Sequence, residues 1–330
     1  MKAFLCKEFG PVESHTVEEI EDPVAGPGQI VVDIKATGIS FPDVLIVQGL
    51  YQFKPPFPFS PGSEISGVVS SVGEGVTLHK EGDRVMGSIG SGGLREKGVY
   101  LEQQLMPLPD SMDFNTAAGF PLNYGTTYHA FKQRGELKEG QSVLVLGAGG
   151  GLGITAIHIA KAMGARVIAA ASSQEKIDLC KKEGADEGII YERDMDRDLQ
   201  KKFSDEIKEL TGGGVDMIYD LVGGDYAEPA LRAIARHGKY LVIGFTAGIP
   251  KMPLNLTLLK ECQIVGVFWG QFAAVDHAEN AQNFKELFEL HAQGKIKPFV
   301  TETYSLEDSA KAIKTLEDRK VLGKVVVNME

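Results

Sequence analysis

A glycine-dense turn between an apolar strand and a helical pattern constrains the fold of this chain more than any other feature. Residues 142–163 read SVLVLGAGGGLGITAIHIAKAM, so an apolar run leads into glycines and then into apolar residues at helical spacing. Gly147 predicts a sharp turn off the strand, Gly150 a close approach of the backbone to a bound group, and Gly153 tight helix packing. The helix N-terminus that follows carries about half a positive charge and unpaired N–H groups. The segment is therefore typical of a dinucleotide pyrophosphate site.

The glycine spacing departs from the strict G-x-G-x-x-G pattern. It reads Gly147-x-x-Gly150-x-x-Gly153, and Leu152 stands where the strict pattern has its last glycine. A glycine cluster alone also fits a flexible turn, so the prediction depends on the strand before it and the helix after it. We expect Gly151 and Leu152 to lie at the phosphates with the three spaced glycines.

Strand and helix patterns alternate beyond the turn. After the first strand, which begins at Ser142, the predicted strands are 166–171, 187–191, 215–221, 240–243 and 263–268, and the predicted helices are 174–183, 198–210 and 226–235. Strands that are apolar on both faces and separated by helices predict a parallel sheet covered on both sides. The chain is therefore predicted to be an α/β protein with a doubly wound Rossmann domain.

The first 120 residues show a different sequence pattern, in which short β-like runs are separated by Gly- and Pro-rich turns. These runs are 30–36, 67–72, 83–86 and 99–105. They predict an irregular β-barrel. The tail reads as helix 278–292, strand 300–304, helix 306–316 and strand 323–327. Because six strands already complete the Rossmann sheet, we expect the tail to return to the first domain, which gives 1–121 with 293–330 and 122–292 as the two domains.

Composition excludes several classes of partner. The formal net charge of -11 argues against nucleic acid or an anionic membrane as a partner. No run approaches the roughly 18 apolar residues that cross a bilayer, and residues 1–6 are too short and mixed for a signal peptide. The scattered Cys6, Cys180 and Cys262 predict neither a disulfide framework nor a cysteine zinc cluster. A cytoplasmic location fits these features best.

An ordered set of motifs extends over the whole chain. It consists of GISFPD (38–43), GLY (49–51), PGSEISG (61–67), GDRV (82–85), NYGTTY (123–128), the glycine turn, YDLVG (219–223) and GKV (323–325). This set resembles the medium-chain dehydrogenase/reductase superfamily, in its zinc-independent quinone oxidoreductase, or zeta-crystallin-like, branch. The resemblance implies a GroES-like barrel domain closed by the C-terminal strands, beside a Rossmann domain. Many such relatives are homodimers or homotetramers.

Two positions depart from the zinc-containing branch of that superfamily. That branch has a zinc-binding Cys after Gly-Ile and a His within Gly-His-Glu, where this chain has Ser40 and Ser63. A serine hydroxyl is a poor zinc ligand, and too few donors remain for a three-ligand site. We therefore predict no metal, and expect Glu64 to support the loop.

The end of the second strand predicts which nucleotide is bound. An acidic residue there would repel a 2′-phosphate, but residues 170–173 are uncharged and Lys176 follows one helical turn later. The resemblance places Ser172, Lys176 and Tyr191 around that phosphate. A charge-assisted hydrogen bond contributes about 1.5–3 kcal/mol, which favours NADPH. Glu175 would oppose this preference if its carboxylate pointed inward, and Lys176 could also be a solvated helix residue.

The resemblance implies hydride transfer from C4 of the cofactor to an electrophile that needs no metal. Tyr51, in its Gly-Leu-Tyr setting, is the candidate hydrogen-bond donor, because a phenol with a pKa near 10 stays protonated at neutral pH. The alternative is a tyrosine that only caps a loop. Ser40 and Asp43 fall where relatives line the nicotinamide pocket. The remaining candidate cofactor contacts are Thr126, Gly244, Phe245, Phe268, Trp269 and Lys324.

Three functions stay open at this point. The first is an NADPH-dependent quinone reductase acting on a small-molecule electrophile. The second is an NADPH-dependent reductase of an enone or enoyl-CoA double bond, for which Lys54, Arg95 and Lys97 are too few basic residues to decide. The third is an NADPH-binding structural or regulatory protein with little turnover. Fold alone does not distinguish them.

Overall fold

The computed structural model describes residues 1–318 and 321–329. The chain divides into two compact units. Unit 1 comprises Met1–Leu122 and Pro298–Glu330, and unit 2 comprises Asn123–Lys297. Within the described residues, none of the helices combines the length and the apolar character needed to cross a membrane.

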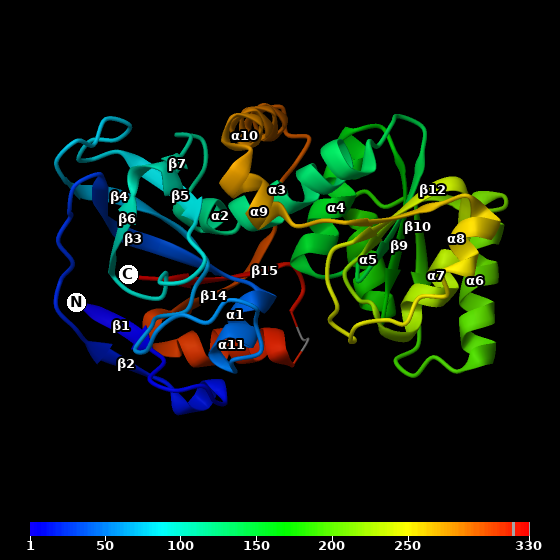
Figure 1. The fold of residues 1–330 in the computed structure, drawn as a ribbon, viewed down its shortest axis with the longest axis horizontal. Helices are drawn as coiled ribbons and strands as arrows, with labels where there is room; N and C mark the ends of the chain where they lie inside the picture. Colours follow the sequence, from blue (N-terminus) through cyan, green and yellow to red (C-terminus); the bar gives the residue numbers. More distant parts are fainter. Residues whose placement is uncertain (319–320, 330) are drawn as a thin grey trace. The chain divides into compact units, whose positions relative to one another are not determined.

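Unit 2 is built on a six-stranded parallel sheet in the order β10-β9-β8-β11-β12-β13. Three of these strands, β9, β10 and β12, are labelled in Figure 1. Its strands are β8 (Ser142–Leu146), β9 (Arg166–Ala171), β10 (Glu187–Ile190), β11 (Val215–Asp220), β12 (Ile234–Val242) and β13 (Gln263–Gly266). The direction of strand addition reverses beside β8, as it does in a dinucleotide-binding sheet. The predicted doubly wound Rossmann architecture is confirmed.

The helices of unit 2 begin at local sequence signals. These helices are α3 (Pro121–His129), whose first two residues belong to unit 1, α4 (Gly151–Ala162), α5 (Gln174–Lys182), α6 (Arg197–Thr211), α7 (Ala227–Arg232), α8 (Asn255–Lys260), α9 (Trp269–Val275) and α10 (His277–Ala292). The Ser173 side chain accepts from the Lys176 N–H to cap α5, and Asp196 caps α6 in the same way. Such caps satisfy N–H groups that the first helical turn leaves unpaired.

The C-terminal end of one predicted helix of unit 2 is wrong. The helix expected over 226–235 ends at Arg232, and β12 begins at Ile234. Ile234 is fully buried and pairs with Val215, with an irregularity before the next ladder pair. Burial of Ile234 in the sheet core therefore outweighs the helical propensity of its alanine neighbours, which is a weak term.

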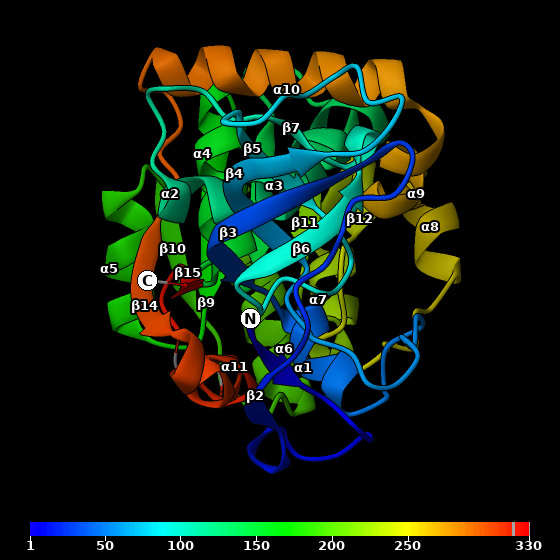
Figure 2. The same cartoon turned by 90° about the vertical axis from the view of Figure 1, so that its left-hand side faces the viewer.

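Unit 1 contains a seven-stranded sheet and a short hairpin. The sheet follows the order β14-β15-β3-β4-β5-β7, with β6 also paired to β3, and β1 pairs with β2. The strands of both sheets of unit 1 are β1 (Lys2–Leu5), β2 (Thr16–Glu19), β3 (Gln29–Ile39), β4 (Glu64–Val72), β5 (Arg84–Ser88), β6 (Lys97–Leu101), β7 (Met106–Pro107), β14 (Val300–Ser305) and β15 (Lys324–Asn328). Figure 2 shows β3 and β4 side by side. The tail enters this sheet because β15 pairs antiparallel with β3.

Three helices of unit 1 frame its apolar core. They are α1 (Phe41–Val47), α2 (Phe114–Ala118) and α11 (Ser309–Glu317). Val44 of α1 and Ile313 of α11 belong to one buried cluster with Ile39 and Val325, so both helices cover the β3 and β15 end of the sheet. This packing fixes the start of α1, where several predicted site residues lie.

Candidate functional site

The turn between β8 and α4 has the backbone geometry that its glycines predict. Gly147 has a φ of 78°, a conformation that favours glycine. The N–H groups of Gly147 and Ala148 both donate to Ala170 O, at 3.1 and 3.0 Å. A Cβ on Gly153 would lie 2.4 Å from Ala148 O, so the close packing of α4 on the turn requires glycine there.

Gly150 differs from its neighbours because the protein itself leaves room for a side chain. A Cβ at this position would have Gly147 O as its nearest neighbour, at 3.8 Å. Gly150 is also the N-cap of α4, and Gly151 and Leu152 form the first turn of that helix. Open space above a glycine at a helix N-terminus suits a pyrophosphate that approaches the backbone closely. These residues therefore fit a dinucleotide.

The residues expected at the 2′-phosphate lie on segments that follow or adjoin the end of β9. The Tyr191 N–H donates to Ala171 O at 3.0 Å. Tyr191 therefore lies beside Ala171, which Ser172 follows directly in the chain. A Cβ on Gly149 would lie 2.8–3.0 Å from Cβ, Cγ and Cδ of Lys176, so the stem of Lys176 lies along the glycine turn. Glu175 is exposed on α5. The phosphate contacts themselves stay a prediction.

The other candidate cofactor residues of unit 2 occupy unlike environments. Thr126 is half-buried on α3, and Gly244 N–H donates to Asp220 O at 3.1 Å just beyond β12. Phe245 and Phe268 are exposed. Trp269 is buried: its indole covers Gly125, and its Nε1 donates to Asn280 Oδ1 at 3.0 Å. The structure thus gives Trp269 a packing position, and its contact with the cofactor stays a prediction.

Asp220 is a buried polar residue at the carboxyl end of β11 that the sequence analysis did not single out. Its Oδ1 accepts from Val222 N–H at 2.8 Å and Gly223 N–H at 3.0 Å, and its Oδ2 accepts from Tyr240 Oη at 2.6 Å. Burial raises the pKa of this carboxyl. Asp220 therefore holds the loop at a strand end where doubly wound sheets bind ligands. The available signal was an acidic residue at the end of an otherwise apolar strand pattern.

In unit 1, Ser40 and Asp43 form the N-terminal cap of α1. Asp43 is fully buried, and its Oδ2 accepts from Ser40 N–H at 2.8 Å and from Ser63 Oγ at 3.3 Å. Its Oδ1 accepts from Gly62 N–H at 3.0 Å. Burial raises the pKa of Asp43 to about 6. Asp43 thus ties the start of α1 to the loop that precedes β4, and a direct contact with the nicotinamide stays a prediction.

Lys324 makes a buried ion pair beside the same helix start. Its Nζ donates to Ser40 Oγ at 2.6 Å and to Glu64 Oε2, and Ser40 Oγ donates to Glu64 Oε2 at 3.1 Å. Glu64 Oε1 accepts from Leu122 N–H at 2.7 Å. Both charged side chains are buried. A contact of Lys324 with the cofactor stays a prediction. The network with Ser40 and Glu64 could not be predicted from the sequence, because its members lie far apart in the chain.

Tyr51 lies four residues beyond α1, after the Gly49 turn with its φ of 70°. The ring is half-buried and packs on the apolar cluster that contains Val44 and Phe59. Burial, and then the nearby Asp43 carboxylate, raise the pKa of the phenol. Tyr51 therefore stays protonated at neutral pH, as a hydrogen-bond donor must.

The described residues contain no group of three His, Cys, Asp or Glu side chains placed to hold a metal ion. At the positions that hold zinc ligands in the zinc-containing branch, Ser40 accepts from the Lys324 ammonium and Ser63 donates to Asp43. The hydroxyl groups of both serines, which stand where metal ligands would be needed, are therefore engaged in hydrogen bonds within the protein.

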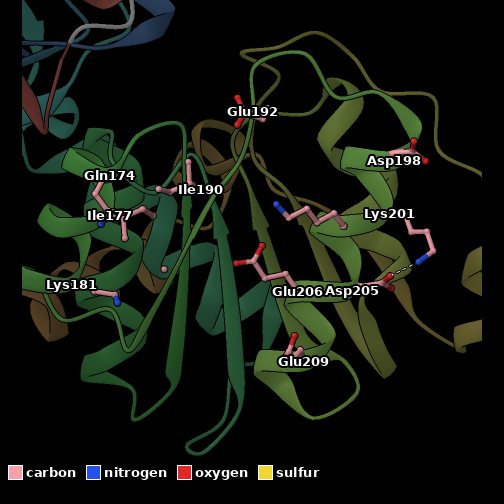
Figure 3. Close-up of a pocket in the computed structure, with 12 residues that line it drawn as sticks. Gln174, Ile177, Lys181, Ile190, Glu192, Asp198, Lys201, Asp205, Glu206 and Glu209 are labelled. Atoms are coloured by element: carbon pink, nitrogen blue, oxygen red, sulfur yellow. Dashed lines mark hydrogen bonds and ion pairs between the residues drawn. The ribbon is translucent and has the colours of Figure 1, made fainter.

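A groove of about 960 Å³ lies at the β10 edge of unit 2, between α5 and α6 (Figure 3). Gln174, Ile177 and Lys181 line it from α5, while Lys201 and Glu206 line it from α6. Lys201 pairs with Asp205 in this groove. None of the twelve lining residues is a predicted site residue.

Comparison with known proteins gives consistent matches over both units. The profile of the alcohol dehydrogenase GroES-like domain matches residues 26–110, and that of the zinc-binding dehydrogenase matches residues 151–291. The chain is 37% identical to the quinone oxidoreductase-like protein 2 homolog of Nematostella vectensis, over 99% of this chain and 88% of that protein.

Two solved structures share the fold over nearly the whole chain. A probable oxidoreductase from Mycobacterium abscessus superposes with a TM-score of 0.88 at 36% identity, covering 99% of this chain and 98% of that one. The quinone oxidoreductase of Escherichia coli, complexed with NADPH, superposes with a TM-score of 0.91 at 29% identity, covering 99% and 100%.

Proposed function

The chain belongs to the medium-chain dehydrogenase/reductase superfamily, in its zinc-independent quinone oxidoreductase branch, and on that premise we propose that it is a cytoplasmic NADPH-dependent quinone reductase. When bound, NADPH would supply a hydride to the quinone, and one proton would complete the hydroquinone, so that two electrons and two hydrogens would enter the acceptor. The chain must bind the cofactor, orient the acceptor and stabilise the oxygen that receives charge.

The residues that would hold NADPH come from backbone and side-chain features of unit 2. Gly150 and the first turn of α4 are suited to the pyrophosphate, because the helix N-terminus offers N–H groups and open space. Lys176, whose stem lies along Gly149, is suited to the 2′-phosphate. The complex of the Escherichia coli relative with NADPH supports the same choice of cofactor.

The buried Lys324 ammonium is the main observation that favours chemistry without zinc. It lies within hydrogen-bond distance of Ser40 Oγ and of a Glu64 oxygen. A divalent cation brought to these oxygens would be repelled by the ammonium and would have to displace a buried ion pair. An acceptor that needs no Lewis acid fits this site, and in a quinone conjugation spreads the arriving charge onto a distant oxygen.

Tyr51 is the proposed donor to that oxygen. Its pKa is raised by burial, so the hydroxyl keeps its proton through the neutral pH range. A donor placed where charge develops stabilises the transition state more than the ground state. Solvent can supply the second hydrogen of the hydroquinone, so the role of Tyr51 is stabilisation of charge as much as proton transfer.

The test is an anaerobic panel with the purified protein. NADPH or NADH is offered with benzoquinones, small enones and enoyl-CoA esters, and oxidation of the nucleotide is followed by absorbance. We expect turnover with NADPH and quinones. Faster turnover of an enoyl-CoA ester would transfer the assignment to double-bond reduction, and tight NADPH binding without turnover of any acceptor would indicate a structural or regulatory protein.

The prediction that the protein binds no zinc is tested separately. Elemental analysis of the purified protein should find no stoichiometric zinc, and a chelator should leave turnover unchanged, since Ser40 and Glu64 are engaged with Lys324. About one tightly held zinc per chain, with turnover lost on its removal, would refute the ligand argument.

We also propose that the chain is a homodimer. Within unit 2, β13 stands at the end of the strand order, and the neighbouring helix α8 exposes Leu258 and Leu259. A sheet edge beside exposed apolar side chains favours association with a second copy. Sedimentation equilibrium should give about twice the chain mass, and Leu258→Glu should shift the protein toward the monomer.

A further inference from the structure

The loop that carries Tyr51 also carries exposed apolar side chains, and the Phe9 ring lies against its start. These side chains, which we call the aromatic patch, are Phe9, Leu50, Phe53 and Phe57, with exposed fractions of 37%, 69%, 55% and 44%. The Phe9 and Phe57 rings meet edge to face with centroids 4.6 Å apart. Single exposed apolar residues are ordinary, but a group of them beside a candidate site indicates a binding surface.

The aromatic patch is continuous with the packing beneath Tyr51. Phe59 is buried in the cluster on which Tyr51 packs, and its ring centroid lies 5.7 Å from that of Phe57 and 6.5 Å from that of Phe9. A Cβ on Gly49 would come within 2.8 Å of the Phe9 ring. Gly49 therefore brings the start of the Tyr51 loop directly against the patch, so both surfaces rest on one set of side chains.

The charges around the patch suit an apolar ligand better than a phosphorylated one. Lys54 Nζ lies over the Phe9 ring, 5.7 Å from its centroid. Arg95 Nε donates to Gly92 O at 2.6 Å, and Lys97 pairs with Asp22. Two of the three basic residues considered for a coenzyme A ester are thus engaged within unit 1.

We propose that the aromatic patch binds the apolar body of the acceptor, so that the preferred substrates are quinones carrying a long alkyl or polyprenyl-like substituent. This inference rests on the proposed function, and it adds the substrate class. Tyr51 holds the quinone oxygen, and the substituent lies across Phe53, Leu50 and Phe57. Burial of apolar area would then distinguish substituted quinones from the bare ring.

The kinetic experiment compares two acceptors that share one redox core. With saturating NADPH, 1,4-benzoquinone and 2-decyl-1,4-benzoquinone are assayed with the native protein and with Phe53→Ser. The control is Leu78→Ser, because Leu78 lies elsewhere in unit 1 and its exposed fraction of 58% is close to the 55% of Phe53. Phe53→Ser should raise KM for the decyl compound about tenfold, the order expected for losing one apolar contact, and leave kcat and the values for benzoquinone within about twofold. Leu78→Ser should change neither acceptor.

A binding experiment separates this inference from the proposed function. The dimethyl ether of decylhydroquinone cannot accept hydride, so its affinity is measured by calorimetry without turnover. Binding that weakens about tenfold in Phe53→Ser supports the patch even if no quinone is reduced. Quinone reduction with equal KM values in the native protein and Phe53→Ser, and equal affinity for the ether, would overturn the patch and leave the reductase assignment in place.

Two further measurements on Phe53→Ser test other occupants of the patch. If Phe53→Ser abolishes flotation of the protein with phosphatidylcholine vesicles but leaves the affinity for the ether unchanged, the patch is a membrane contact and the proposal is overturned. If the variant changes the sedimentation mass with unchanged affinity, the patch is an interface between copies, which also overturns it.

Discussion

The two units build their candidate sites in opposite ways. In unit 2 the features suited to the pyrophosphate are made by the backbone of one continuous segment, with Gly147, Gly150 and Gly153 within seven residues. In unit 1 the central polar network is made by side chains from remote segments, since Lys324 meets Ser40 and Glu64 across 284 and 260 residues. A site made of local backbone can be recognised from its sequence, whereas a site made of distant side chains needs the fold.

This difference predicts different consequences of substitution. Removing a side chain from the network of unit 1 leaves a buried charge or donor without its partner, and such losses are among the largest that single substitutions cause. Adding a methyl group in the glycine turn of unit 2 has consequences that depend on whether protein atoms or open space lie above the glycine.

Lys324→Met should lower the free energy of unfolding by about 3–5 kcal/mol, because it leaves the Glu64 carboxylate buried without its cation. Urea denaturation measures the change. The double variant Lys324→Met with Glu64→Gln should recover part of the loss, since the uncompensated charge is gone. Lys311→Met, which removes an exposed pair with Asp308, serves as the control and should change little. Native-like stability of Lys324→Met would show that the pair contributes nothing.

Tyr51→Phe should leave nucleotide affinity nearly unchanged and reduce turnover of an enone or enoyl thioester about 10- to 1000-fold, the range for losing one donor to developing charge. A quinone should lose less, because its reduction potential already favours hydride acceptance and solvent can protonate the product. Stopped-flow reduction with each acceptor measures the difference. Near-native rates on every acceptor would leave Tyr51 as a residue that only packs on the core of unit 1.

Gly153→Ala and Gly150→Ala form a matched pair within the turn of unit 2. A Cβ at Gly153 would clash with Ala148 O, so the first variant should lose about 1–3 kcal/mol of stability. A Cβ at Gly150 meets no close protein atom, so the second should keep its stability while its dissociation constant for NADPH rises about tenfold. Equal stability losses in both variants would contradict the distinction between packing and ligand approach.

Lys176→Glu should abolish or reverse the preference for NADPH over NADH. The native preference should be about tenfold or more, because one charge-assisted contact to the 2′-phosphate contributes about 1.5–3 kcal/mol. Fluorescence titration of both nucleotides measures it. Lys181→Glu, in the last turn of the same helix, is the control for a general change of charge. Equal affinities of the native protein for NADPH and NADH would remove the basis of the prediction.

The regular part of the fold could be predicted because its signals are local. The bounds of β9 match the predicted strand 166–171. A run that is apolar on both faces must be covered on both sides, and a central strand of a covered parallel sheet meets that requirement. Unit 1 was harder to predict: α1 begins with the cap of Ser40 and Asp43, which depends on Gly62 and Ser63 from another segment. The early start of β12 depended likewise on the pairing of Ile234 with Val215.

Four features can be read from the amino-acid sequence: the glycine turn, the doubly wound sheet, the loss of zinc-ligating residue types at Ser40 and Ser63, and the family. Three others required the folded chain: the neutralisation of Glu64 by Lys324, the burial of Trp269 against Gly125, and the contact of Phe9 with Phe57 beside the Tyr51 loop. The reason is physical. Backbone conformation and periodic burial depend on neighbours within a few residues, whereas ion pairs and ring contacts depend on which remote segments the packed core brings within a few ångströms of each other.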